Sequence, residues 1–395
     1  MDIVKNPKVD WLGYKWIFFG LSVLLAVGGG ISLLTRGLNL GVDFTGGTLV
    51  YAKFKDAPEL DRIRTALQEL RAEQVSRFDD VSKNEVQIRM ARVETDEFQV
   101  LADQATMVLD ALHKEFNQGQ ATEGRVDLSN TTRTELGEKL LALDPDQLNA
   151  DLGNPVALES ARVQYAAMAG RIIDFRTDQG GIFRDFAELD AIDISGEAKG
   201  KLKENSYLGD FSLLSVESVG PKVGQELQDR AQSAIIFSLL GILAYIAYRF
   251  RPIFGLAAII ALFHDVFITL GFFSISQKEI SLTVVAAVLT LVGYSINDTI
   301  VVFDRVRENL MLMRRQDLRT VINTSINQTL NRTILTSGGT FLAVGALYFL
   351  GGQVLNGFSF ALAVGIIVGT YSSVAIASPI VLWWQNFSER KKAGR

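Results

Sequence analysis

Apolar residues gather in six runs, each long enough to cross the roughly 30 Å hydrocarbon core of a bilayer. The runs cover residues 16–34, 231–248, 252–275, 280–303, 333–350 and 358–384. The first run is long and lacks a small-residue cleavage site, so we interpret it as an uncleaved helix rather than a signal peptide. The pattern therefore predicts a multi-pass membrane protein with six spanning helices.

Lys and Arg residues lie unevenly at the two ends of these runs. They occur before the first run, between the second and third, after the fourth, and in the tail 386–395, whereas the short loops at the other end hold only Lys278. Because positive residues favour the cytoplasmic side, we expect both termini in the cytoplasm. The segment between the first two runs then lies outside, in the periplasm or the extracellular space.

That external segment carries a mixed pattern of strands and helices. Alternating or β-rich stretches predict strands at 48–54, 75–78, 85–93 and 213–219. Apolar residues at helical spacing predict helices after Asp56 and Pro58 and over residues 98–116. The order strand-helix-strand-strand-helix-strand is that of a split βαβ unit, so residues 36–118 and 213–230 are expected to form an external α+β, ferredoxin-like domain.

Residues 119–212 interrupt this domain and differ from it in charge. They hold 17 Asp and Glu against 10 Lys and Arg, a net charge of −7 in a chain whose total is −5. The pattern of 181–189 and 201–202 predicts short paired helices. An acidic segment does not attract a polyanion, so nucleic acid binding is not expected. We interpret the segment as a helical insertion, a docking surface or brace, or a passive addition.

Charged residues inside the runs are the strongest functional candidates. An Asp at a helix centre costs about 2.5–3.5 kcal/mol on insertion scales, so such residues usually face protein or water. Asp298 lies in the inner half of the fourth run beside Asn297, and Asp265 lies near the middle of the third. Arg332 lies close to the inner end of the fifth run, and its long side chain could reach the level of Asp298.

These residues have the chemistry of a proton relay. Burial raises the pKa of a carboxyl group and a nearby guanidinium lowers it, so relative movement of the two can bind and release a proton. One charge crossing 100 mV supplies about 2.3 kcal/mol. We therefore interpret Asp298, Arg332, Asp265 and Asn297 as a candidate relay. The alternative is a static polar contact between helices, worth about 0.6 kcal/mol on average.

Other chemistry has little support in the sequence. The chain has no Cys and two His, so neither a disulfide nor a metal site is expected. No phosphate-binding glycine loop with a following Lys-Ser/Thr occurs, so nucleotide hydrolysis is not expected either. We predict no enzymatic activity and no cofactor other than protons. The division along the chain is residues 1–35, the interrupted external domain, a five-helix bundle over 231–385 and the basic tail.

Several motifs resemble those of the SecD/SecF family, in its SecF form. They are GVDFTGGT at 41–48, SVGPKVG at 218–224, the pair His264-Asp265, VGYSINDTIVVFDRVREN at 292–309 and NRTILTS at 331–337. The family motif residues in the first two are Gly41, Asp43, Gly46, Gly47, Gly220 and Pro221. The fold implied by the resemblance is six transmembrane helices of the resistance-nodulation-division type with an external domain after the first.

The resemblance also implies a function. It indicates a proton-motive-force-driven component of the Sec protein translocase in the bacterial cytoplasmic membrane, acting with a SecD homologue and the SecYEG channel on unfolded preproteins. YajC, YidC and membrane lipid are further implied partners. Asp298 and Arg332 match the family positions implicated in proton conduction. A proton-coupled exporter of small molecules or lipids in the same superfamily is the alternative. Segment 119–212 is larger than the family leads us to expect, so the resemblance does not imply its role. We interpret it as a lineage-specific docking surface or a brace against SecD, with a passive addition as the alternative.

Overall fold

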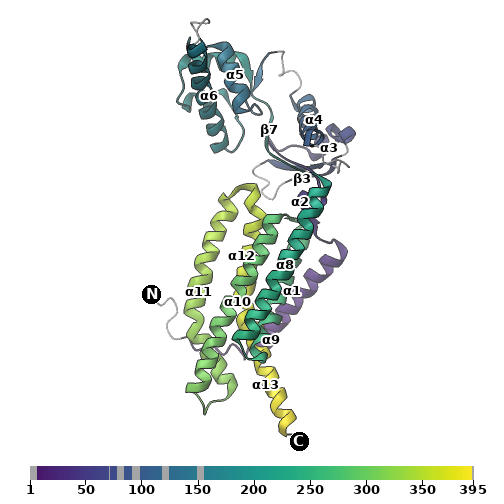
Figure 1. The fold of residues 1–395 in the computed structure, drawn as a ribbon, viewed down its shortest axis with the longest axis vertical. Coiled ribbons are helices and arrows are strands. Elements are labelled where there is room, and N and C mark those ends of the chain that lie inside the picture. Colours follow the sequence, from purple (N-terminus) through teal and green to yellow (C-terminus); the bar gives the residue numbers. More distant parts are fainter. Residues whose placement is uncertain are drawn as a thin grey trace. The chain divides into compact units, whose positions relative to one another are not determined.

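The computed structural model describes residues 7–70, 72–77, 84–90, 98–117, 124–148 and 155–393 (Figure 1). They form two compact units. One comprises Met1–Phe44 and Glu226–Arg395, and the other comprises Thr45–Gln225. The chain passes from the first unit to the second at Phe44 and returns at Glu226, so the GVDFTGGT motif straddles the first passage.

Within the described residues, six helices are long and apolar enough to cross a membrane, as the hydrophobic runs predict. They are α1 (Lys15–Thr35), α8 (Pro221–Arg249), α9 (Pro252–Ser276), α10 (Leu282–Leu312), α11 (Leu318–Leu350) and a last helix in three parts. That last helix consists of α12 (Gly352–Ser372), the π-helical segment Ser373–Ala377 and α13 (Ser378–Ala393). Helices α8, α10 and α11 extend beyond the runs, because polar residues continue the helical backbone outside the apolar stretch.

Three of the spanning helices pack around α10. Helices α9, α11 and α12 all contact α10, and α1 packs against α9; Figure 1 shows α10, α11 and α12 side by side. Glycine allows the closest of these approaches, since a Cβ added to Gly29 of α1 would lie 2.9 Å from the Cα of Gly271 of α9. Phe303, Leu262 and Ile322 are among the buried side chains of the core that these helices share.

The ends of the helices are tied by polar contacts. Arg249, the last residue of α8, donates to both carboxylate oxygens of Asp304 on α10 at 2.7 and 2.8 Å. Before α1, Asp10 accepts hydrogen bonds from Arg319 and Asn323 of α11 at 2.6 Å each. Exposed ion pairs add little stability, so these contacts chiefly fix which helix ends are neighbours.

The second unit contains a four-stranded sheet in the order β3-β4-β2-β7. Its elements follow one another as β2 (Gly47–Phe54), α3 (Leu60–Ala66), β3 (Ala72–Arg77), β4 (Glu85–Met90), α4 (Phe98–Phe116) and β7 (Phe211–Val219). All neighbours are antiparallel, and Val50 at the centre pairs with Ile88 on one side and Val216 on the other. This is the split βαβ arrangement that the sequence predicts. Residues 78 and 91–93 of the expected strands lie outside the described residues.

The core of the sheet comes from one face of the strands and the two helices. Val50 and Ile88 of the sheet pack with Ile63 of α3 and with Val108 and Leu112 of α4, and all five side chains are buried. The alternation of the strands and the helical spacing of Leu60, Ile63 and Leu67 place these residues on one side. The first helix begins at Leu60, two residues after Pro58.

The segment between α4 and β7 is helical and has a core of its own. It contains α5 (Arg133–Leu143), α6 (Pro155–Asp178), a 3-10 turn (Phe186–Ala191), α7 (Gly196–Asn205) and a parallel pair of short strands, β5 (Val126–Asp127) and β6 (Ser206–Tyr207). Helix α5 starts with a capping box formed by Thr132 and Glu135. It packs along α6 (Figure 1). Where the sequence predicts short paired helices, at 181–189 and 201–202, the structure has the 3-10 turn and α7, which contact each other. Leu140, Tyr165 and Phe183 lie in this core.

The helical segment also completes the edge of the sheet. Strand β7 is an edge strand, and an uncovered edge leaves backbone groups without partners. Asn130 supplies them: its Nδ2 donates to the carbonyl of Phe211 at 2.9 Å, and its Oδ1 accepts from the amide of Leu213 at 2.9 Å. Ser212 Oγ donates to the carbonyl of Ser129 at 2.6 Å. The inserted segment is therefore bonded into the sheet domain.

We predict that Asn130→Ala loosens this edge. The two backbone groups of β7 lose their partner, and an unsatisfied buried polar group costs about 1–3 kcal/mol. Hydrogen exchange of the full chain in detergent should show faster exchange at Leu213. Gln164→Ala, which removes an exposed side chain of α6 bonded only to Ser160, serves as the control, and equal protection in both variants would contradict the role of Asn130.

Candidate functional site

Asp298 lies inside the helical bundle and is held by hydroxyl groups from two other helices. Its side chain is on α10, and the residue is 2% exposed. Ser337 Oγ of α11 donates to Asp298 Oδ2 at 3.0 Å. Thr370 Oγ1 of α12 lies 3.2 Å from the same oxygen and 2.9 Å from Ser337 Oγ, so it can donate to either. The fourth-span carboxylate is thus the meeting point of α10, α11 and α12.

Arg332 is not brought into contact with this carboxylate. It lies on α11 five residues before Ser337, about 7.5 Å along the axis at the α-helical rise. Thr333 and Ser337 occupy the buried stripe of α11, whereas Arg332 is exposed on the neighbouring stripe. Among the residues that the structure describes, Arg332 forms no ion pair with Asp298 or any other carboxylate. In the part of the chain that the structure describes, Arg332 and Asp298 thus share no direct contact.

Asp265 is the centre of a second polar cluster. It lies on α9 and is fully buried. Its Oδ2 accepts from Ser295 Oγ of α10 at 2.5 Å and from Ser372 Oγ of α12 at 2.7 Å, and its Oδ1 lies 2.9 Å from Nδ1 of His264. Ser295 precedes Asp298 by three residues, which places both clusters on one face of α10.

Asn297 takes no part in either cluster. It is exposed, and it makes no hydrogen bond to any of the described residues. The reason is helical geometry: neighbouring positions on a helix point about 100° apart, so a buried Asp298 turns Asn297 outward. Of the four residues predicted for the relay, Asp298 on α10 and Asp265 on α9 are both buried and both contact α12. Arg332 and Asn297 lie at the surface of the bundle.

Small residues bring α12 close enough to reach both acids. A Cβ added to Gly369 would lie 3.1 Å from the Cβ of Ser295, and one added to Gly365 would collide with Leu291. These glycines form a small-xxx-small pattern that permits close helix packing. Thr370 and Ser372 follow directly, and the π-helical segment begins at Ser373. Such π segments occur frequently at functional sites.

Sequence reasoning missed Thr370 and Ser372. Hydroxyl residues are common in membrane helices because they can bond to a carbonyl of the preceding turn, so singly they carry little signal. Their position beside the glycine pattern, in the run Gly369-Thr370-Tyr371-Ser372-Ser373, is the signal that could have identified them.

The first half of the GVDFTGGT motif fastens the segment after α1 to the start of α10. Strand β1 (Asn39–Leu40) pairs in parallel with β8 (Glu279–Ile280), and the amide of Gly41 donates to the carbonyl of Ile280 at 2.9 Å. A Cβ at Gly41 would lie 3.0 Å from the carbonyl oxygen of Ile280 and 2.8 Å from Glu279 Oε1, so a larger residue would displace its neighbours. Asp43 Oδ2 accepts from the amide of Leu282, the first residue of α10, at 2.8 Å.

The second half of the motif and SVGPKVG shape the base of the sheet domain. Gly46 and Gly47 have φ of +70° and +120°, in the region that favours glycine. Gly47 pairs with Val219 across β2 and β7, and a Cβ at Gly46 would lie 3.3 Å from the Cα of Pro221. Gly220 is buried between β7 and α8, and Pro221 is the first residue of α8, a favourable position for proline. These motif residues therefore act through backbone geometry.

The site can hold protons but offers no metal cage. Each buried carboxylate is surrounded by hydroxyl groups, which can donate to a carboxylate or accept from a carboxylic acid. In the described ranges, no group of three or more His, Asp or Glu could hold a metal ion. In the described residues, six helices long enough to span a membrane, with buried acids on α9 and α10, occur together with a split βαβ domain. The chain is therefore a multi-pass membrane protein with buried acids in its helical bundle.

Comparisons with known proteins identify the family. The C-terminal model of the protein export membrane proteins SecD/SecF matches residues 199–387, and the SecD/SecF GG motif model matches residues 31–58. The protein translocase subunit SecF of Koribacter versatilis is 41% identical over 98% of this chain and 94% of its own length. That of Calditerrivibrio nitroreducens is 34% identical over 99% of each chain. The chain belongs to the SecD/SecF family, among the SecF proteins.

Solved structures agree with the assignment. The crystal structure of SecDF from Thermus thermophilus, titled a translocon-associated membrane protein, is similar with a TM-score of 0.62 and 29% identity. The similarity covers 96% of this chain and 39% of the SecDF chain. A second SecDF structure, in a super-membrane-facing form, has a TM-score of 0.54.

The interpretation of segment 119–212 as a lineage-specific docking surface or brace stays a prediction. In the structure the segment is bonded to the sheet through Asn130, whose side chain pairs with backbone groups of β7.

We predict that Asp43 stabilises the start of α10 as a helix cap does. Asp43→Ala removes the acceptor for the amide of Leu282 and should lower the free energy of unfolding by about 1 kcal/mol, whereas Asp43→Asn keeps an acceptor oxygen and should lose less. Thermal unfolding of the purified chain in one detergent measures both variants. An Ala variant as stable as the Asn variant would show that the cap contributes nothing.

Proposed function

We propose that this chain is a component of the bacterial Sec protein translocase that uses the proton-motive force to help complete the export of preproteins across the cytoplasmic membrane. The main observation in support is the buried Asp298 carboxylate, which is bonded by hydroxyl groups of α11 and α12. The relatives of the chain are named protein translocase subunits. A charge at this depth is costly, and a cost of this kind is typical of proton pathways.

The hydroxyl surroundings suit a group that gains and loses a proton. Ser337 and Thr370 can donate hydrogen bonds when Asp298 is ionised, and either can accept one when Asp298 is protonated. A carboxylate held by Lys or Arg would favour one state only. In this proposal, loading and release of the proton at Asp298 shift the packing of α10 against α11 and α12. Asp265, tied to the same helices, responds with it.

The exposed position of Arg332 supports the proposal that a partner subunit lies beside this chain in the membrane. An exposed guanidinium within a spanning helix is unfavourable against lipid, so we infer that a second polypeptide or a conformational change covers it. A SecD homologue is the proposed partner, because the Thermus SecDF protein is 48% identical over 184 residues that make up 25% of its length. The remainder of such a fused chain would correspond to SecD. We extend the assembly to SecYEG, and to YajC and YidC, on family grounds alone.

The distribution of Lys and Arg supports an orientation for this assembly. Positive residues gather at one set of helix ends, which favours one side of the membrane. They are Lys15 at the start of α1, Arg249 at the end of α8, Arg251 before α9, and Arg314 and Arg315 after α10. In the proposal, that side is the cytoplasm, and the unit Thr45–Gln225 lies on the outer side, where it acts on the emerging preprotein.

We predict that Asp298→Asn abolishes proton-driven export. The amide cannot carry a proton, yet it keeps the side-chain volume and an acceptor for Ser337. The measurement is preprotein export into inverted vesicles with and without a proton gradient, with copurification of SecD as the test of assembly. Asp304→Asn, on the same helix but ion-paired with Arg249 at its end, is the matched control. Gradient-dependent export at the wild-type rate in Asp298→Asn would remove the proposed role.

We also predict that Arg332→Met lowers proton flux while leaving the chain folded. Met retains much of the side-chain length and loses the charge that, in the proposal, a partner subunit or a conformational change covers. Proton flux in vesicles reconstituted with the SecD partner should fall at least tenfold. Arg314→Met, which removes an exposed charge after α10, should have no such effect. Normal flux in the Arg332 variant would mean that the guanidinium serves only topology.

A further inference from the structure

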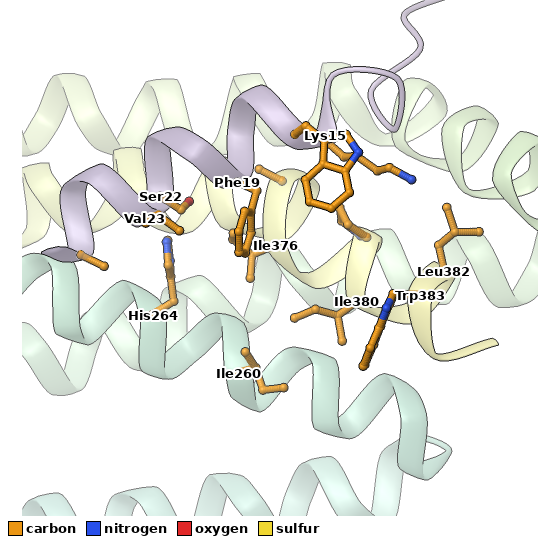
Figure 2. A pocket seen from close by; sticks show the side chains of 14 residues that line it. Lys15, Phe19, Ser22, Val23, Ile260, His264, Ile376, Ile380, Leu382 and Trp383 are labelled. Atoms are coloured by element: carbon orange, nitrogen blue, oxygen red, sulfur yellow. The ribbon is translucent and has the colours of Figure 1, made fainter. Parts of the chain in front are cut away.

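A crevice on one side of the bundle contains no residue of the Asp298 cluster. Helix α1, helix α9 and the last helix enclose a space of about 530 Å³. Its walls are mostly apolar, with Phe19 and Val23 from α1, Ile260 from α9, and Ile376 and Ile380 from the last helix (Figure 2). An apolar cavity of this volume lies in the range of ligand-binding sites.

The crevice has the depth of one bilayer leaflet. Its wall on α1 runs from Lys15 to Ala26. Eleven residues of helix rise about 16 Å, and half of the roughly 30 Å hydrocarbon core is about 15 Å. The space therefore matches the acyl region of a single leaflet.

One end of the crevice is polar and cationic. Lys15 lines it and, within the part of the chain that the structure describes, makes no ion pair or hydrogen bond through its ammonium group. Trp16 and Trp383 lie at the same end, and Trp side chains prefer the level of the lipid headgroups. Figure 2 shows Lys15 and Trp383 toward one end and His264 toward the other.

We propose that this crevice binds one anionic phospholipid, with an acyl chain between α1 and the last helix and the headgroup phosphate at Lys15. The other candidate occupant, a helix of a partner protein, offers no specific complement to an unpaired ammonium group beside two Trp side chains. A single acyl chain is narrow enough, and the uncompensated ammonium at the mouth complements a phosphate.

The deep end of this lipid site adjoins the Asp265 cluster. His264 lines the crevice, and its Nδ1 lies 2.9 Å from Asp265 Oδ1. Its Nε2 is buried and has no hydrogen-bond partner in the described ranges. The bound acyl chain thus packs against the side chain that contacts Asp265.

The headgroup contact is tested with the full chain in detergent. The protein is incubated with phosphatidylglycerol or phosphatidylcholine, and retained lipid is counted by native mass spectrometry. Lys15→Gln should lower retention of phosphatidylglycerol roughly fivefold, since a basic residue near a lipid surface is worth about 1 kcal/mol. Lys8→Gln removes the exposed Lys8, which does not line the crevice, and should leave retention unchanged. Equal retention in both variants would overturn the phosphate contact.

The acyl contact is tested by filling the crevice. Ala26→Phe and, independently, Val23→Phe should abolish retention of both lipids, whereas Val27→Phe on the exposed face of α1 should not. Retention unaffected by filling would mean that lipid binds only around the surface of the bundle, which overturns the site. Crosslinking from position 23 in native membranes to a protein instead of lipid would overturn it as well, because a polypeptide would then occupy the crevice.

Discussion

The structure of the membrane bundle depends on the burial of a carboxylate among apolar helices. Asp298 is costly inside a membrane unless polar groups surround it, and the chain supplies them from two helices distant in sequence, through Ser337 and Thr370. For both hydroxyls to reach one oxygen, α10, α11 and α12 must pack closely. Gly365 and Gly369 meet this requirement, because any larger side chain at those positions would strike α10.

Helix α12 bonds both buried acids, and α10 carries one of them and bonds the other, so the surroundings of the two carboxylates are linked. Ser295 of α10 and Ser372 of α12 bind Asp265, while Asp298 and Thr370 on the same two helices form the other cluster. A change in the position of α12 relative to α10 therefore alters the surroundings of both carboxylates. Asp43 adds a contact at the start of α10, where its carboxylate accepts from the amide of Leu282.

Much of the fold could be predicted from local pattern because the physical signals are local. A span is defined by the length of an apolar run, and the strands of the split βαβ unit by alternation over a few residues. Asp298 was identifiable from the cost of its charge alone. Thr370 and Ser372 were not, because a hydroxyl in a helix becomes informative only when a distant acid is known to lie beside it. The pairing of Arg332 with Asp298 followed from their similar depth, and depth does not say which stripe of α11 faces α10.

The sequence by itself determined the number of spans, the split βαβ domain, the family and the presence of buried acids in the third and fourth spans. These depend on composition and on periodicities of a few residues. Only the tertiary structure decided which hydroxyls surround each acid, that Arg332 and Asn297 lie on the exposed side, and that segment 119–212 completes the edge of the sheet through Asn130. Such contacts join residues far apart in the chain, and their geometry is set by how helices rotate and pack against one another, which no local pattern specifies.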